Sequence, residues 1–382
     1  MRSIQVLAAL NNVQDAFVLE SALPSAVEAP LSPPAKRRRE GKDGSLGRVF
    51  SGGWAVAAVC TLVAAGTLTG LIYLGQNPPP LPPVHSDVLT QPETTDTVPD
   101  TEGVVTESLI YVSHGDGTCS VKASSGFGEK QGDVHLVIPE VSPQGDTVTA
   151  VAEYGFIWKT GIQTVILPGS VERIGQWAFA GCSALESVTL PTGLAGIETA
   201  AFLECTALTE IILPEGLTTL GDSVFSTCTA LQRVSLPGTL AVIPKWAFYN
   251  CASLKELTFS EGNQEVGYSA FCGCTALSTL DLPARLLTVG SGGFAGCTAL
   301  LAVTVPEGLT VLENLAFDGC TRLATVTLPQ SLERMGSTAF RECSSLRTVV
   351  YTGTREAWRA LGETKAFPAG SSIHCADGVL KQ

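Results

Sequence analysis

Cysteine is the residue type in this chain best suited to chemistry. Of twelve cysteines, eight recur in steps of 23 residues: Cys182, Cys205, Cys228, Cys251, Cys274, Cys297, Cys320 and Cys343. In stacked repeats each would lie one strand spacing, about 4.8 Å, from the next, and parallel side chains in register do not reach the dihedral angle of about 90° of a disulfide. A metal site would need converging ligands such as a CxxC pair or histidine, which the repeat lacks. We therefore predict buried free thiols that act as small apolar spacers. Disulfides of Cys119, Cys272 or Cys375 stay open.

Motifs of enzymes are missing from the sequence. The four histidines, His85, His114, His135 and His374, are solitary and lie outside the regular repeat. No GxSxG, phosphate-binding loop or HExxH motif occurs. Acids such as Glu186 are interpreted as solvated surface charge, because paired catalytic carboxylates need a dry pocket. The sequence predicts a protein that is not an enzyme and has no cofactor or metal.

The same 23-residue step appears in other residue types, and it predicts the fold. Leucine follows each of these cysteines by three residues, and phenylalanine precedes each by three, with one further copy ahead: Phe156, Phe179, Phe202, Phe225, Phe248, Phe271, Phe294, Phe317 and Phe340. A unit that short cannot bury an apolar face alone, so neighbouring units must stack and share a core. We expect the phenylalanines and cysteines to form the structural ladder of that core.

One unit shows how each coil is built. Val188 and Leu190 alternate with polar residues, as in a half-buried strand, and Pro191 ends the strand because it cannot donate to the ladder. Leu194 and Ile197 return to the core from the opposite wall. The sequence thus predicts an α/β solenoid with a continuous parallel β-sheet on one face and short strands or helical turns on the return.

The outward strand positions form the candidate binding face. They are small, rich in threonine and without tryptophan or tyrosine: Ser187, Thr189, Glu210, Ile212, Arg233, Ser235, Glu256, Thr258, Thr279, Asp281, Thr304, Thr325 and Thr327. The aromatic anchors of tight interfaces and of sugar sites are missing from this face. We expect a broad protein contact of modest affinity.

The repeated units, from AFAGCSALESVTLPTGLAGIETAAF to AFRECSSLRTVVYTGT, resemble the leucine-rich repeats of BspA-type bacterial surface proteins, the 23-residue class described as Treponema-type. The resemblance covers residues 134–381. It implies a leucine-rich repeat solenoid and adhesion to proteins of a host or a neighbouring cell. Residues 134–151 resemble the divergent first coil of the family, and residues 351–358 with 373–378 resemble its closing segment.

The end coils would expose the shared core, so caps are expected there. Leu109–Ser113 and Thr118–Ala123 flank HGDG, which is a hairpin signal. At the other end, Thr354 is the expected N-cap of a short helix whose Trp358 and Leu361 cover the last coil.

One coil departs from the pattern. Ser260 replaces the proline of the repeat, Asn263 replaces its leucine, and Cys272 is an extra cysteine beside the ladder. Two interpretations stay open, namely drift in a tolerant return loop or a local irregularity that binds a ligand.

A membrane segment precedes the repeat. Trp54 to Leu74 carries no charge and is long enough to cross a hydrocarbon layer of about 30 Å as a helix. Basic residues cluster within 36–48, and no Lys or Arg follows the segment until Lys122, so the positive-inside rule predicts a cytoplasmic N-terminus. A cleaved signal peptide is the alternative, but the long N-terminal region and the lack of a small-x-small site favour an uncleaved anchor.

The two sides of this segment differ in charge and in expected partners. Residues 1–52 have a formal charge of +2, and the remainder has −15, which argues against nucleic acid as a partner of the repeat. Within residues 4–17, apolar residues recur every three or four positions, as on one face of a helix. This helix would bind lipid or a cytosolic partner, or else belong to a weakly ordered tail.

The order of these parts predicts a membrane-anchored cell-surface scaffold for protein interaction and adhesion. The alternative is a transmembrane sensor or regulator whose cytoplasmic helix docks a signalling partner. The expected domains are a cytoplasmic tail (1–52), a transmembrane helix (53–75), an acidic spacer rich in proline and threonine (76–107), an N-terminal β cap (108–133), the solenoid (134–351) and a C-terminal cap (352–382).

Overall fold

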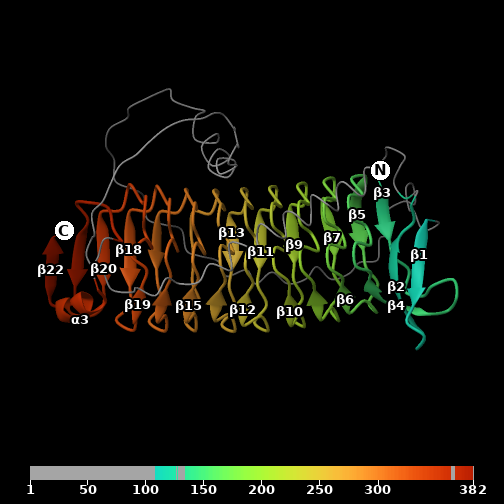
Figure 1. The fold of residues 1–382 in the computed structure, drawn as a ribbon, viewed down its shortest axis with the longest axis horizontal. Helices are drawn as coiled ribbons and strands as arrows, with labels where there is room; N and C mark the ends of the chain where they lie inside the picture. The colour runs from blue at the N-terminus through green and yellow to red at the C-terminus, as the bar shows by residue number, and fades with distance from the viewer. Residues whose placement is uncertain (1–107, 126, 128–133, 363–365, 382) are drawn as a thin grey trace, which may run out of the picture. The chain divides into compact units, whose positions relative to one another are not determined.

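The computed structural model describes residues 108–125, 127, 134–362 and 366–381. The expected tail, membrane helix and spacer lie outside the described residues. Among the residues that are described, no helix has the length and apolar character needed to span a membrane. They form a parallel β-solenoid of about ten coils with little helix, and the coils follow one another in a row in Figure 1.

One row of strands runs along one side of the coils. It consists of β3 (Val134–Val137), β5 (Ile162–Ile166), β7 (Ser187–Thr189), β9 (Glu210–Ile212), β11 (Arg233–Ser235), β13 (Glu256–Thr258), β16 (Ala302–Thr304), β18 (Thr325–Leu328), β20 (Thr348–Tyr351) and β21 (Ser372–Cys375). Paired strands are parallel and keep the repeat register, so that Arg233 lies opposite both Glu210 and Glu256. Equivalent residues of successive coils therefore lie side by side.

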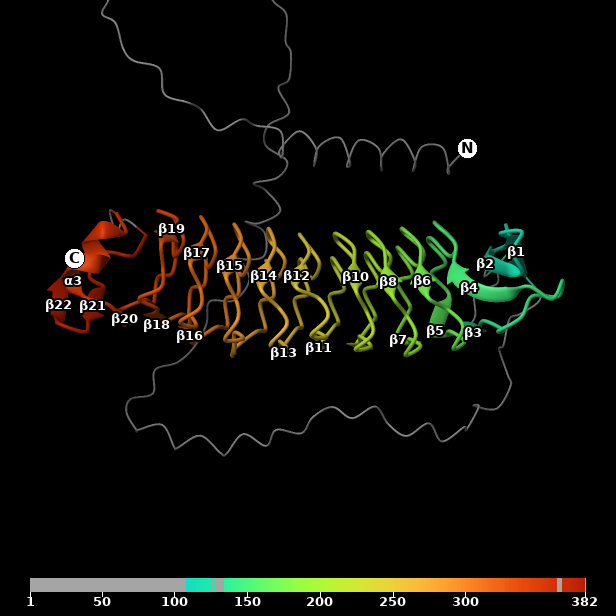
Figure 2. The ribbon, with the colours of Figure 1, turned by 90° about the horizontal axis from the view of Figure 1, so that it is seen from below.

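A second row of parallel strands forms the return, on the other side of each coil (Figure 2). It consists of β4 (Thr147–Val151), β6 (Arg173–Ile174), β8 (Gly196–Ile197), β10 (Thr219–Leu220), β12 (Val242–Ile243), β14 (Glu265–Val266), β15 (Thr288–Val289), β17 (Val311–Leu312) and β19 (Arg334–Met335). Of the two predicted forms of the return, the coils adopt short strands rather than helical turns.

The prediction of one continuous sheet on the strand face is wrong. The first row divides into three hydrogen-bonded sheets, β3-β5-β7, β9-β11-β13 and β16-β18-β20-β21, the last of which continues into β22 (Gly378–Lys381). The coil of Thr279 has no strand in this row, and its Asp281 forms a single bridge to Thr304. These strands are short, with three to five residues each, so each step contains few hydrogen bonds and the loss of one or two ends the ladder.

The phenylalanine ladder fills the core between the two rows. The nine rings of Phe156 to Phe340 are buried, and successive ring centroids are 5.2–5.5 Å apart with interplanar angles of 1–16°. Two further phenylalanines that the spacing did not indicate extend the ladder. Phe127 contacts Phe156 edge-on, and Phe367 stacks on Phe340 with centroids 5.1 Å apart. The caps thus continue the core as well as cover it.

Both ends of the solenoid carry the elements expected from the sequence. Strands β1 (Leu109–Ser113) and β2 (Thr118–Ala123) form an antiparallel hairpin that joins the return row through β4. At the other end, the helix α3 (Arg355–Ala360) begins after Thr354, whose side chain accepts a hydrogen bond from the backbone nitrogen of Ala357. Trp358 is buried, and Leu361 packs against the core beside it.

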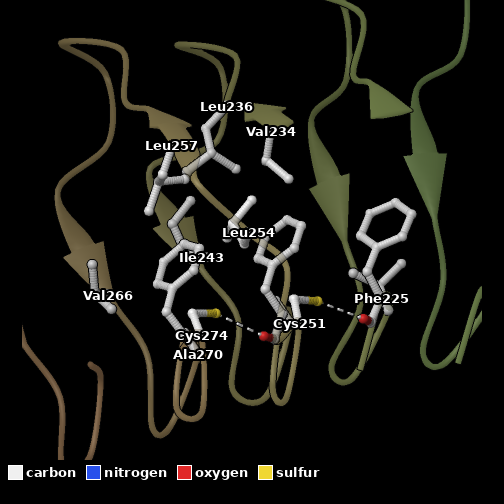
Figure 3. Close-up of a cluster of buried hydrophobic side chains, with 14 of the residues drawn as sticks. Phe225, Val234, Leu236, Ile243, Cys251, Leu254, Leu257, Val266, Ala270 and Cys274 are labelled. Carbon is white, nitrogen blue, oxygen red and sulfur yellow. Dashed lines mark hydrogen bonds between the residues drawn. The ribbon is translucent and has the colours of Figure 1, made fainter. Parts of the chain in front are cut away.

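The cysteine ladder does more than fill space. All eight side chains are fully buried free thiols, and each Sγ donates to the backbone oxygen of the phenylalanine in the preceding coil at 3.0–3.5 Å. Figure 3 shows two of these bonds, from Cys251 to Phe225 and from Cys274 to Phe248. A thiol is a weak donor. The bonds nevertheless link every coil to the one before it, which the prediction of purely apolar spacers missed.

Replacing Phe248 by alanine is expected to lower the free energy of unfolding by about 3–5 kcal/mol, because a buried ring leaves a cavity. Phe248 is fully buried and stacks on Phe225 and Phe271. Denaturant unfolding followed by circular dichroism measures this loss. The matched control is Tyr268→Ala, since Tyr268 is 49% exposed, and a loss there as large as that of Phe248→Ala would contradict the ladder as the main source of stability.

Candidate binding face

The structure places the predicted face on the outer side of the first strand row. The side chains between its positions point inward, and Ile211, Val234 and Leu257 are buried. Exposed positions of the face are Ser187, Thr189, Ile212, Arg233, Glu256, Thr258, Thr279, Asp281 and Thr304, and half-buried ones are Glu210, Ser235, Thr325 and Thr327. The register brings the residues of β9, β11 and β13 together. Thr279 and Asp281 lie where the hydrogen-bonded sheet is interrupted.

Charged residues alternate across the central part of the face. The guanidinium of Arg233 donates to Glu210 Oε2 at 2.8 Å, and Glu256 lies on the other side of Arg233 in register. The hydrogen bond with Glu210, followed by its charge, raises the pKa of Arg233. The Arg233 side chain is exposed and that of Glu210 is partly accessible to solvent, so the ion pair adds little stability. The pair fixes the Glu210 carboxylate beside Arg233 on the outer side of the row.

The described histidines hydrogen-bond to hydroxyl side chains. His114 hydrogen-bonds to the hydroxyls of Thr118 and Ser120, and His135 to that of Thr164. Within the described ranges, no group of three or more His, Cys, Asp or Glu side chains converges as a metal site. In the part of the chain that the structure describes, the face is a run of exposed and half-buried strand residues, an arrangement that suits binding by surface contact.

The irregular coil has a structural explanation. Asn263 is fully buried, its amide nitrogen donates to the backbone oxygens of Pro237 and Leu240, and its Oδ1 accepts from the backbone nitrogen of Ser260. The hydroxyl of Ser260 donates to the oxygen of Leu236. All these polar groups are satisfied by the preceding coil or by the loop itself. Ser260 and Asn263 therefore build a polar link between coils. Drift of the loop and a local ligand site both stay predictions.

Burial controls the chemistry of the ladder thiols. Desolvation raises the pKa of Cys182 to about 12 and that of Cys228 to about 12. The same cause raises the pKa of Cys205, Cys251 and Cys274 well above the ordinary value. Because the thiolate is the reactive form, these groups are inert in the folded chain.

The eight ladder thiols are expected to resist a thiol reagent until the protein unfolds. Cys272 and Cys375 are only half-buried, so they serve as references that are expected to react in the folded state. Titration with and without denaturant, in the absence of reductant, measures both groups. Ladder cysteines that stay silent in denaturant would mean that disulfides form, which would contradict the geometry of the ladder.

Aromatic side chains gather at a place that sequence reasoning missed. Trp158, Trp177 and Trp246 lie in the turns that lead from the return row to the strand row, two residues before or after a ladder phenylalanine. Tyr154 occupies the same kind of position. The sequence carries the signal as a distance of two residues from a ladder phenylalanine, on one side of it or the other.

Comparison with known proteins identifies the repeat. The model of the BspA type leucine rich repeat region matches six copies, over residues 149–278 and 241–359. No curated protein matches the chain. Among solved structures, a leucine-rich repeat protein of T. pallidum is 32% identical over 52% of this chain and 91% of that chain, with a TM-score of 0.47. A leucine-rich cell surface protein of Faecalibacterium prausnitzii is 23% identical over 68% of this chain and 97% of that chain, with a TM-score of 0.37.

Proposed function

Because this chain belongs to the family of BspA-type leucine-rich repeat proteins, we propose that it is a membrane-anchored cell-surface scaffold that binds protein partners through the outer side of its strand row. The observation that supports this most is the parallel register of β9, β11 and β13, which presents equivalent side chains of successive coils as one surface. Shallow, extended surfaces of this kind are what solenoids use for binding.

The proposed partner is a protein outside the cell, held with modest affinity. The side chains of this face are mostly small and polar. The large aliphatic side chains of Ile166 and Ile212 also point outward and are 38% and 37% exposed. Tight interfaces rely on buried aromatic and arginine anchors. This face has no aromatic residue, and its Arg233 is exposed and paired with Glu210. Avidity from many copies on one cell would compensate for a weak single contact.

Protease shaving of intact cells tests the topology. The N-terminal basic cluster and the uncharged stretch that follows it support a cytoplasmic N-terminus. The repeat is then expected to be released from the cells, and an epitope within residues 1–52 to be protected. A protected repeat together with a cut N-terminal epitope would refute the proposed orientation.

Charge reversal on the strand face tests the binding surface. Arg233→Glu would place a third carboxylate between Glu210 and Glu256 in the same row. In cells that display the full chain, this variant is expected to capture less partner protein by cross-linking than wild type does. The matched control is Val242→Thr on the return row, where the side chain is 49% exposed. Equal capture by wild type and Arg233→Glu, or a loss confined to the control, would contradict the strand face as the site.

A further inference from the structure

The strand β1 is the terminal strand of the return-row sheet. The sheet has the order β1-β2-β4-β6-β8-β10, and β1 lies at its N-terminal end (Figure 1). Within the described part of the chain, β1 pairs with β2 and with no other strand. A terminal strand presents a row of backbone N–H and C=O groups to which a further strand can bond.

The hydrogen bonds of the hairpin identify the backbone groups that face this edge. The nitrogen of His114 donates to the oxygen of Thr118, and the nitrogen of Ser124 donates to the oxygen of Ser108. Because hydrogen-bonded pairs alternate along an antiparallel ladder, the even-numbered residues of 108–114 bond to β2. The odd-numbered residues direct their N–H and C=O groups away from β2, and they are Leu109, Tyr111 and Ser113.

The composition of β1 suits an edge that is covered by another strand. Leu109 and Tyr111 pack against the core, whereas Ile110 and Val112 are 41% and 43% exposed. Proteins protect open edges with lysine, proline or a bulge. The five residues of β1 include no charge and no proline, and their register with β2 is unbroken. The edge strand at the other end of the solenoid, β22, does contain a lysine, Lys381.

We propose that β1 pairs antiparallel with β1 of a second copy of this chain, so that two solenoids are joined end to end through their N-terminal caps. A two-fold axis at Tyr111 places Tyr111 opposite Tyr111 and Leu109 opposite Ser113 of the second copy. All three outward residues of each strand are then paired, which gives about six backbone hydrogen bonds. An axis at Ile110 or Val112 would leave one outward residue of each strand unpaired.

The side chains fit the same register. Ile110 lies opposite Val112 of the second copy, and the symmetry repeats this contact. These are the pairs without mutual hydrogen bonds, in which the Cα atoms are only about 4.5 Å apart and the side chains are in closest contact. Both exposed aliphatic side chains of β1 are thereby covered. Residues 53–382 carry a formal charge of −15, but the strands that meet are uncharged, so no like charges face each other in this ladder.

A second copy fits this edge better than the other end of the solenoid does. The strand β22 belongs to the sheet of the first row, whereas β1 belongs to that of the return row, so pairing β1 with β22 would join unlike rows. Pairing β1 with itself continues one sheet and gives a closed, isologous contact. A ladder of five residues is small beside the ~800 Å² per partner of a standard interface, so we expect a dissociation constant in the micromolar range.

Register-specific cross-linking tests this contact in the purified full-length chain in detergent. Ile110→Cys and Val112→Cys chains carry tags of different size, are mixed, and are oxidised mildly with copper phenanthroline. We expect a disulfide between the two chains, because positions 110 and 112 of paired copies have Cα atoms about 4.5 Å apart. Thiols are blocked with N-ethylmaleimide before denaturation, and the mixed dimer is measured by non-reducing electrophoresis.

Each cysteine variant alone is the matched control. In the proposed register the two copies of position 110 are more than about 7 Å apart, as are those of position 112, which is beyond the reach of a disulfide. Wild type gives the background from the natural cysteines, including the half-buried Cys272 and Cys375. A yield in the mixture no greater than in the single variants or in wild type would overturn the proposal.

Proline at Ser113 tests the backbone pairing without a new thiol. The N–H of Ser113 points away from β2, so Ser113→Pro removes a donor of the proposed contact and leaves the β1–β2 bonds in place. Sedimentation velocity is expected to show a dissociation constant about tenfold or more higher than that of wild type. Ser113→Ala keeps the N–H and should dimerise as wild type does.

Thermal unfolding followed by circular dichroism checks the fold of both variants, which should unfold at similar temperatures. If Ser113→Pro unfolds early, the cross-linking of the cysteine variants decides instead, since they contain no proline. A wild-type chain that stays monomeric well above micromolar concentration, or equal dissociation constants for Ser113→Pro and Ser113→Ala when both are folded, would refute pairing through β1.

Discussion

Raising the pH from about 8 to about 11 is expected to unfold the solenoid, with a loss of stability far steeper than that of an ordinary domain. The cause is the cysteine ladder. Burial raises the pKa of Cys182 and Cys228 to about 12 each, and the pKa of Cys205, Cys251 and Cys274 rises for the same reason. In the unfolded chain a cysteine has a pKa of about 8.5.

The direction of the effect follows from proton binding. Above about pH 8.5 the unfolded chain releases the thiol protons while the folded chain keeps them, so the unfolded state gains stability with each further unit of pH. The stabilising contribution of each thiol is complete below the unfolded pKa and is lost as the pH rises toward the folded value. Each fully buried thiol then contributes about 1.4 kcal/mol per pH unit. Burial also raises the pKa of Tyr111 and Tyr351, which acts in the same direction.

Chemical denaturation at several pH values measures the slope, and Cys228→Ala isolates one thiol. The variant is expected to be less stable than wild type at neutral pH and to lose stability less steeply above pH 9, by about 1.4 kcal/mol per pH unit. A wild-type stability that stays constant up to about pH 10.5 would contradict buried, protonated thiols. Because a solenoid can unfold from its ends, the transitions should be followed with more than one probe.

Replacing Cys228 by aspartate is expected to cost about 4–7 kcal/mol at neutral pH, which is enough to melt the surrounding coils. The side chain of Cys228 is fully buried in the core, and its neighbours are the ladder residues Phe202 and Phe225. A carboxylate there must either remain charged without a partner or bind a proton at a pKa several units above its usual value. Either way, the free energy of unfolding falls.

Two neighbouring substitutions separate charge from volume. Cys228→Ser replaces the thiol by a hydroxyl that can donate to the oxygen of Phe202, and it should cost far less stability than aspartate. Cys228→Ala leaves a small cavity and should also cost far less than aspartate. Cys272→Asp places the same charge at a half-buried position and is the matched control. Comparable losses in Cys228→Asp and Cys272→Asp, measured by denaturant unfolding, would show that the ladder position is not specially intolerant of charge.

Most of the architecture could be predicted because the repeat is regular. Phe156 to Phe340 share one phase, so the only arrangement that buries them all is a stack of equivalent coils. The hairpin of β1 and β2 and the N-cap of α3 depend on short-range signals, and both occur at the residues expected. The binding face stays a prediction, because small polar side chains on a strand row do not by themselves specify a ligand.

Other features escaped prediction because they depend on the distance between coils. Phe127 and Phe367 lie outside the 23-residue phase, so the spacing could not place them on the ladder. The interruption of the sheet at Thr279, where Asp281 forms a single bridge to Thr304, has no counterpart in the residue pattern of the repeat. The role of Asn263 required the positions of the carbonyl oxygens in the preceding coil.

The sequence by itself determined that this chain stacks 23-residue coils, which residues form the core and where the chain is capped, because burial of a periodic apolar pattern has a single regular solution. The tertiary structure alone decided how neighbouring coils bond to one another and which side chains share an edge. The thiol of Cys251 meets the oxygen of Phe225, and Tyr154 lies beside Trp177, only because the stack brings residues far apart in sequence to within one strand spacing.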